Sequence, residues 1–156
     1  PQAVLTGMND VLYGNTGHEF ATACYAFLDT ESGRLRMGSA GHPPALVWKA
    51  DRKSLLSIRP PGRLLGIFSD PVFEFEELWL ESGDRVVLYT DGIVEAHPQN
   101  KDTDFFGEER LRNVIAAAAG ATASELMQAI LSDLDGWTGG QEYCQDDVAL
   151  VVLEIS

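Results

Sequence analysis

One stretch near the middle of the chain, residues 82–96, restricts the fold more than any other. After a polar Ser-Gly-Asp turn, residues 86–89 (Val-Val-Leu-Tyr) form a nearly continuous run that favours β-structure. Such a run is typical of a strand that is covered on both faces. The pattern then changes abruptly to Thr90-Asp91-Gly92, where a carboxylate follows the strand and the glycine lets the backbone turn away. The stretch therefore predicts a buried strand with one acidic side chain at the rim of its sheet.

A second acidic pair, Asp146 and Asp147, stands directly before the apolar segment 148–153 near the end of the chain. Two strands that each carry an aspartate at one end could direct both carboxylates at one divalent cation. Mg²⁺ and Mn²⁺ are hard cations that prefer oxygen ligands, so the residue type fits. The ordinary alternative is that Asp91 and Gly92 form a β-turn and that the second acidic pair has no special role. We favour the metal site because the apolar residues around Asp91 lack the alternation of a hairpin.

The net charge of −13 argues against several classes of protein. Nucleic-acid-binding proteins need clusters of Lys and Arg, and none occurs in this sequence. The same charge argues against anionic membrane surfaces, and no apolar run approaches the ~18 residues of a membrane span. With 156 residues, 45% of them apolar, the chain has the size and composition of one domain with its own core. Two distant cysteines, Cys24 and Cys144, predict free thiols in a reducing compartment, so we expect a cytoplasmic protein.

The remaining segments predict an α+β fold, because the helices are grouped together and do not alternate with the strands. Apolar residues between positions 3 and 12 have helical spacing. They form either the end of a longer helix or a helix whose first turn contains Pro1. A helix is expected over 108–119, and a capping box at Thr122 and Glu125 predicts the start of another. Strands are expected at 20–28, 34–40, 45–49, 54–58, 72–80, 86–89 and 148–153.

Three details of this assignment are specific enough to be tested. Along segment 72–80 the alternation of apolar residues changes from odd positions (Phe73, Phe75) to even positions (Leu78, Leu80). This change predicts a β-bulge at Glu76 and Glu77. Residues 137–141 are expected to form a loop. Five aromatic residues are assigned to the core, namely Phe27, Trp48, Phe73, Phe75 and Trp79.

Other motifs of catalysis or ligand binding are weak or missing. His18, His42 and His97 are not spaced like the ligands of a metal site, and we interpret His42 as a structural loop residue. Ser39 lacks the glycine two positions earlier that a nucleophile elbow needs, which disfavours a Ser-His-Asp hydrolase. The glycine motifs that bind nucleotide phosphates do not occur.

Six short motifs follow one another along the whole chain. They are Phe20-Ala21-Thr22, Gly41-His42-Pro43-Pro44, Leu65-Gly66, then Gly83-Asp84 with Leu88-Tyr89-Thr90-Asp91-Gly92 and Glu95-Ala96, then Phe106-Gly107-Glu108-Glu109-Arg110-Leu111, and Asp146-Asp147-Val148-Ala149-Leu150. With these motifs the chain resembles the bacterial SpoIIE/RsbU-like branch of the metal-dependent PPM (PP2C-type) serine/threonine phosphatases. Each motif alone is weak, but their order makes the resemblance specific.

The resemblance implies both a fold and a chemistry. The fold would be a four-layer αββα sandwich, in which two antiparallel sheets are flanked by helices. Complete domains of this kind hold two Mg²⁺ or Mn²⁺ ions, and a metal-bound water attacks phosphoserine or phosphothreonine in a protein substrate. By motif match, Asp91 and Asp146 are the metal ligands, with Gly92 and Asp147 in supporting positions. The implied substrate is a signalling phosphoprotein such as an anti-sigma-factor antagonist.

The chain also departs from the family pattern. The family's earlier half carries an aspartate that bridges both metals and an Asp-Val-Ser-Gly strand end, and neither occurs here. We therefore expect residues 1–156 to be the C-terminal portion of a single phosphatase domain, incomplete at the N-terminus, with weak metal binding and little turnover alone. Open strand edges would favour a homodimer. The alternative is a non-catalytic interaction module with the fold of a phosphatase.

Overall fold

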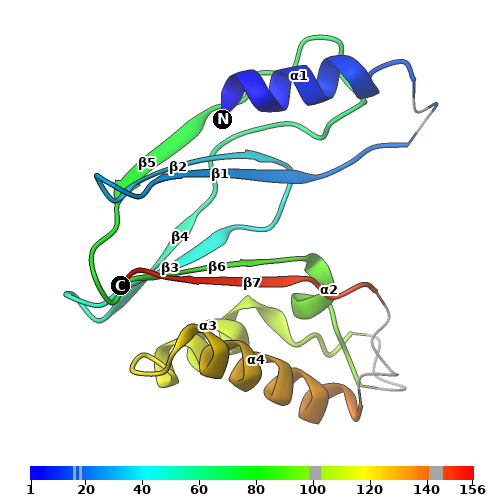
Figure 1. Cartoon of the computed structure of the whole chain (residues 1–156). Helices are drawn as coiled ribbons and strands as arrows, with labels where there is room; N and C mark the ends of the chain where they lie inside the picture. Colours follow the sequence, from blue (N-terminus) through cyan, green and yellow to red (C-terminus); the bar gives the residue numbers. More distant parts are fainter. Residues whose placement is uncertain (16, 18, 99–102, 141–145) are drawn as a thin grey trace. The chain divides into compact units, whose positions relative to one another are not determined.

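The computed structural model describes residues 1–15, 17, 19–98, 103–140 and 146–156 (Figure 1). His18 and Cys144 lie outside the described residues. The chain divides into two compact units, one formed by Pro1–Pro44 with Ile58–Leu80 and the other by Ala45–Ser57 with Glu81–Ser156. Each unit has its own sheet and at least one helix, so the predicted α+β composition is confirmed. In the described part of the chain, no helix is both long enough and apolar enough to span a membrane.

The first unit is a three-stranded antiparallel sheet with one long helix. Its strands are β1 (Ala23–Asp29), β2 (Arg34–Ala40) and β5 (Phe75–Trp79), in the order β1-β2-β5. A hairpin joins β1 to β2, with Asp29 opposite Arg34. Helix α1 (Gln2–Leu12) lies over one face of this sheet (Figure 1). A β-carbon on Gly38 of β2 would lie only 2.9 Å from that of Pro1, so the glycine permits this close packing.

Helix α1 is also tied to the loop that precedes β5. The buried side chain of Asn9 donates a hydrogen bond to the carbonyl oxygen of Phe68 and accepts one from the N–H of Gly66, both at 3.0 Å. A buried amide that is satisfied in this way fixes both partners in place. The apolar core beneath the helix consists of Leu5, Ala40, Leu65 and Phe73.

The second unit is a four-stranded sheet in the order β4-β3-β6-β7, and the β3–β6 and β6–β7 pairs are antiparallel. Its strands are β3 (Ala45–Lys49), β4 (Ser54–Ile58), β6 (Arg85–Tyr89) and β7 (Leu150–Glu154). Its helices are α2 (Asp91–Val94), α3 (Gly107–Ala117) and α4 (Ala123–Thr138). Helices α3 and α4 cover one face of the sheet (Figure 1). The core between them consists of Leu46, Trp48, Val87, Tyr89, Ile93, Ala96, Phe106, Leu111, Ile115, Leu126, Ile130 and Leu134.

The helix signals in the sequence are confirmed where they rest on local chemistry. Thr122 and Glu125 form the predicted capping box at the start of α4. At the other end, however, α4 continues through Trp137 and Thr138, which were expected to lie in a loop. The helix ends at Gly139, whose φ of 87° is a conformation that favours glycine. The glycine pair therefore marks the helix end itself, and the loop prediction was wrong by two residues.

The predicted β-bulge in segment 72–80 is wrong. Strand β5 pairs with β2 without interruption, from Phe75 opposite Gly38 to Trp79 opposite Arg34. The apolar phase appeared to slip because Phe75 and Leu78, three residues apart in one continuous strand, lie on opposite faces of the sheet. Phe73 precedes the strand and packs with Leu5 and Leu65 in the core under α1. The first strand is likewise shorter than expected, since β1 begins at Ala23.

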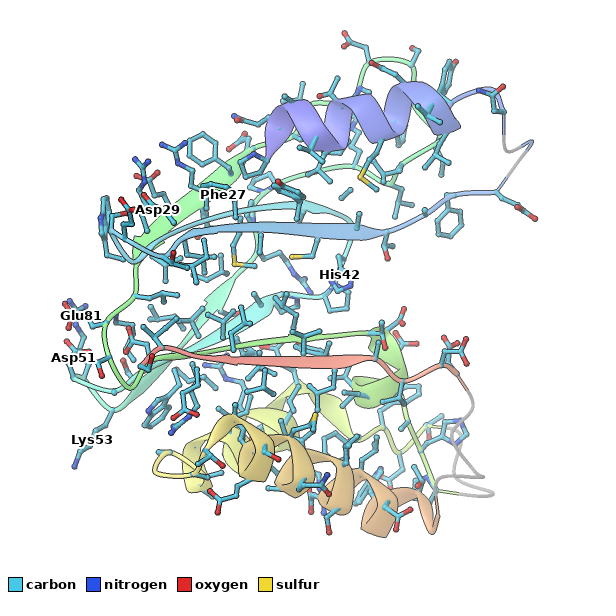
Figure 2. All side chains as sticks on the ribbon, viewed as in Figure 1. Phe27, Asp29, His42, Asp51, Lys53 and Glu81 are labelled. Atoms are coloured by element: carbon cyan, nitrogen blue, oxygen red, sulfur yellow. The ribbon has the colours of Figure 1, made fainter. Side chains whose placement is uncertain are left out.

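Three of the five aromatic residues assigned to the core are exposed. Trp48 and Phe73 are buried, but Phe27, Phe75 and Trp79 retain 50%, 42% and 57% of their accessible surface. Phe27 (labelled in Figure 2) and Phe75 are register neighbours of Arg36 and Gly38 on one face of the first sheet. Gly38 packs against Pro1, so these aromatic residues lie on the same face as α1, and they are exposed where the helix does not cover that face. Aromatic content identified these strands correctly, but it could not show how far the helix extends over them.

Candidate metal centre

The pairing of β6 with β7 brings the two predicted metal ligands to one end of one sheet. Tyr89, the last residue of β6, lies opposite Leu150, the first residue of β7. Asp91 follows Tyr89 by two residues and Asp146 precedes Leu150 by four. Because the strands are antiparallel, both aspartates lie beyond the same end of the pair, where α2 begins (Figure 1).

Asp91 is the first residue of the short helix α2, so the Asp-Gly pair is not the hairpin turn of the alternative interpretation. Thr90 precedes it in an extended conformation, with φ −84° and ψ 160°. One carboxylate oxygen of Asp91 accepts a hydrogen bond from the N–H of Gly92 at 3.1 Å. The chain therefore changes from strand to helix at the acidic residue, and the Asp91 carboxylate is exposed at this transition.

Hydrogen bonds of Thr90 connect the start of α2 to the segment that contains Asp146 and Asp147. Its hydroxyl donates a hydrogen bond to the carbonyl oxygen of Asp147 at 3.0 Å and accepts one from the N–H of Ala149 at 2.9 Å. Its backbone N–H donates to the carbonyl oxygen of Ala149 at 3.0 Å. The backbone bond continues the sheet beyond the last paired residues of β6 and β7, and the two hydroxyl bonds help to hold the two acidic segments in fixed register.

Gly92 is required by close packing and not by an unusual backbone conformation. A β-carbon at this position would lie 2.5 Å from the carbonyl oxygen of Asp147 and 3.3 Å from that of Asp146. The first distance is shorter than real β-carbon contacts, so any larger residue would push the acidic segment away. The sequence-based expectation that Gly92 lets the backbone turn away therefore gave the wrong reason for the glycine.

A small cavity of about 160 Å³ opens beside these residues. Asp146 and Gly92 form part of its wall, together with Glu95, Ala96, His97 and Phe105. The ring of His97 packs edge-on against Phe105, with centroids 6.1 Å apart. Sequence analysis included Glu95 and Ala96 in a family motif but gave them no role. Glu95 and Ala96 follow directly after α2, three and four residues beyond Gly92, and this spacing could have indicated that they lie beside the site.

The donor set fits a hard divalent cation that keeps part of its water shell. Asp91 and Asp146 are both exposed, and each has one carboxylate oxygen bonded to the next backbone N–H, Asp146 to Asp147 at 2.8 Å. Each carboxylate retains its second oxygen for a ligand. Across the described residues, no group of three or more His, Cys, Asp or Glu side chains could hold a metal. Mg²⁺ is commonly bound through one or two carboxylates plus waters, so two aspartates form a minimal site.

The other candidate residues lie away from this site. His42 belongs to the first unit, where its Nδ1 lies 3.1 Å from the carbonyl oxygen of Pro43. Cys24 is half-buried in β1, and burial raises the pKa of its thiol, which disfavours a reactive thiolate.

Comparison with known proteins gives consistent results over the whole chain. The family model described as "Stage II sporulation protein E (SpoIIE)" matches residues 1–156. The phosphoserine phosphatase RsbU of Bacillus subtilis is 28% identical over 154 residues, which are 98% of this chain and 44% of RsbU. The chain thus spans less than half the length of this curated relative.

Two solved structures show the same fold. The SiaA-PP2C domain of Pseudomonas aeruginosa has a TM-score of 0.85 and 17% identity, and the match covers all of this chain and 61% of that one. The Mn-presoaked phosphatase domain of SpoIIE from Bacillus subtilis has a TM-score of 0.73 and 17% identity, with coverages of 99% and 65%. The predicted PP2C-like fold, with two antiparallel sheets flanked by helices, is therefore confirmed.

Proposed function

Because the chain belongs to the SpoIIE family, we propose that it is part of a metal-dependent protein serine/threonine phosphatase domain. One observation supports this function most directly: the three hydrogen bonds of Thr90 and the tight contact of Gly92 hold Asp91 and the Asp146–Asp147 segment together. Two exposed carboxylates at one sheet end suit a cation-assisted reaction on a phosphate ester. The named activity of RsbU, phosphoserine phosphatase, agrees with this proposal.

In this proposal Asp91 and Asp146 bind Mg²⁺ or Mn²⁺, and Gly92 and Asp147 support them. A bound ion of this kind makes a coordinated water more acidic and offsets the charge of the phosphoryl group. Asp147 contributes through its backbone, since its carbonyl oxygen accepts from Thr90 and its N–H donates to the Asp146 carboxylate. Gly92 contributes by its lack of a side chain. A complete domain would hold two such ions, as the family resemblance implies.

The proposed substrate is a phosphoserine or phosphothreonine in a bacterial signalling protein, such as an anti-sigma-factor antagonist. The relationship to RsbU supports a phosphoprotein substrate. The acidic net charge of −13 makes a basic or neutral region around the phosphorylated residue the more favourable partner.

The direct test measures Mn²⁺ binding and phosphate release from a phosphoserine peptide, with Asp91→Asn and Asp146→Asn as variants. We expect each variant to weaken Mn²⁺ binding at least tenfold, because each removes one of two charged ligands. Asp10→Asn, an exposed aspartate on α1, is the matched control and should change neither quantity. Unchanged binding in Asp91→Asn, or full phosphate release in the presence of a strong chelator, would contradict the proposed function.

The alternative function, a non-catalytic interaction module, is favoured by one observation. The described residues contain no group of three or more potential metal ligands. Phosphate release in saturating Mn²⁺, measured on a protein that contains the complete domain, separates the two functions, because a module without catalytic activity would release no phosphate although it folds normally.

We also propose that the protein forms a homodimer through an open strand edge. The strand orders leave β1 and β5 at the edges of the first sheet, and β4 and β7 at the edges of the second. Edge strands present unpaired backbone groups that can bind another strand. Sedimentation velocity over a range of concentrations tests this, and a single monomeric species at high concentration would contradict it.

A further inference from the structure

A second polar cavity lies in the first unit, in residues to which the proposed metal site assigns no role. Its volume is about 270 Å³, which exceeds the ~30 Å³ occupied by one liquid water several times over. It forms where β2 ends and where the loop after β4 passes beside it. The lining residues are Ser39, Gly41, His42, Arg59, Pro60, Pro61 and Gly62.

The walls of this cavity are held firmly in place. A β-carbon on Gly62 would lie 1.8 Å from the carbonyl oxygen of Ser39, so the loop is pressed against the end of β2. The same loop is anchored on its other side, where the N–H of Glu74 donates to the carbonyl oxygen of Pro61 at 2.9 Å. Gly41 adopts a φ of 71°, a conformation that favours glycine, and packs against Leu64. The cavity is therefore preorganised.

The donors available to a ligand come mainly from side chains. Pro60 and Pro61 have no backbone N–H, so they form a wall without donors. The polar side chains that line the cavity are Ser39, His42 and Arg59. The Ser39 hydroxyl donates a long hydrogen bond of 3.4 Å to the carbonyl oxygen of His42, which a charged oxyanion would replace as the acceptor. The Nδ1 of His42 faces a carbonyl oxygen, which can only accept, so this nitrogen carries the proton. In the imidazolium form the other ring nitrogen, Nε2, also becomes a donor.

Arg59 has no ionic partner among the described residues. Seven other cationic side chains pair with carboxylates, at Arg34, Arg36, Lys49, Arg52, Arg85, Arg110 and Arg112. Of the two that remain in the described part of the chain, Arg63 stacks on Phe68 and Lys53 is exposed. Arg59 is exposed and lines a cavity whose wall also contains a histidine and a serine and no carboxylate. A planar guanidinium binds oxyanions through two parallel hydrogen bonds, and a hydroxyl adds a third contact.

We propose that this cavity, named here the Arg59 pocket and lined by the seven residues above, binds a phosphate group. Arg59 supplies the positive charge, and His42 and Ser39 supply polar groups beside it. The choice of phosphate among tetrahedral oxyanions rests on the proposed function, since phosphate occurs in both its substrate and its product. The binding itself needs no metal ion. Figure 2 labels His42, which lies just after the end of β2.

The test is an NMR titration of the protein carrying Asp91→Asn, with a chelator present so that the proposed metal site cannot contribute. The probes are inorganic phosphate, a phosphoserine peptide and the same peptide without phosphate. We expect saturable shifts of the Arg59 Nε–H and His42 ring signals with the two phosphate-containing probes. The Arg59→Gln variant should weaken binding about tenfold, because a charge-assisted contact is lost.

Arg63→Gln is the matched control, because Arg63 lies in the same loop but stacks on Phe68 at 4.6 Å and does not line the cavity. It should bind phosphate like the parent protein, whereas His42→Gln should bind less tightly. Tighter binding of the phosphopeptide identifies a phosphoprotein as the source of the ligand, and tighter binding of free phosphate identifies the reaction product. Absence of saturable shifts, equal binding of the unphosphorylated peptide, or equal weakening by Arg63→Gln would overturn the proposal without affecting the metal site.

Discussion

The backbone of Gly92 lies against the carbonyl oxygen of Asp147, so close that a β-carbon would come within 2.5 Å of it. This contact joins two segments that are 55 residues apart in the sequence. It explains how a one-turn helix after β6 and an irregular segment before β7 present their aspartates at one end of the sheet. The following predictions test this arrangement and the stability of the unit that contains it.

Gly92→Ala should damage both stability and function. The added methyl group meets backbone atoms, which cannot move aside as a side chain can, so we expect a loss of about 1–3 kcal/mol in the free energy of unfolding. Displacement of the Asp146–Asp147 segment should lower phosphatase activity about 100-fold, as a misplacement of about 1 Å can. Gly136→Ala on α4 is the control, because a β-carbon there meets nothing within 4 Å. Equal activity of the two variants would show that the contact has no role.

Thr90→Val should show what the hydroxyl of Thr90 contributes, because valine has nearly the same shape but no hydroxyl. The substitution removes the bonds to Asp147 and Ala149, so we expect destabilisation of about 1–2 kcal/mol and weaker Mn²⁺ binding. Thr90→Ser retains the hydroxyl and should preserve most of the Mn²⁺ affinity. Calorimetry of unfolding and of Mn²⁺ binding measures both effects. If serine and valine reduce Mn²⁺ affinity equally, the hydroxyl does not hold the site together.

The buried pair of Lys49 and Asp84 should make the second unit sensitive to acid. Burial by itself raises the pKa of Asp84, but hydrogen bonds from Lys49 and from the N–H groups of Glu81 and Ala50 outweigh it, so the pKa is lowered from its ordinary value of 3.8. A lowered pKa in the folded state stabilises the fold above the pKa of the unfolded state. This stabilisation is lost as the pH falls through the lower, folded-state pKa.

Asp84→Asn should therefore flatten the decline in the free energy of unfolding below about pH 4. Asp84→Ala, which removes the carboxylate from beside the buried Lys49 ammonium, should lower the free energy of unfolding at pH 7 by about 3 kcal/mol or more. Chemical denaturation between pH 2.5 and 7 measures both. A variant whose acid profile matches that of the parent protein would contradict this prediction.

Thr122→Ala should destabilise α4 without touching the proposed site. The substitution removes the side chain that accepts from the N–H of Glu125 at the start of the helix. We expect a loss of about 1 kcal/mol in stability and no change in Mn²⁺ binding or phosphate release. Thermal unfolding and the peptide assay measure these quantities. A loss of activity at temperatures where the variant is fully folded would show that α4 is coupled to the site.

The sequence by itself determined those features that depend on local chemistry. The strand 34–40, the strand 45–49 and the capping box at Thr122 follow from residue pattern, and the structure reproduces them. The order of the motifs also identified the family and the two aspartates at strand ends.

Only the tertiary structure decided the features that depend on long-range packing. Whether Phe27 and Trp79 are buried depends on how far α1 extends over their face of the sheet, and hydrophobicity along one strand does not contain that information. Position 92 requires a glycine because the carbonyl oxygen of Asp147, 55 residues away in the sequence, lies against it. The Arg59 pocket likewise forms only because a loop is pressed against the end of β2. Contacts of this kind arise when distant backbone segments meet, because no periodicity within a single segment specifies which other segment will lie against it.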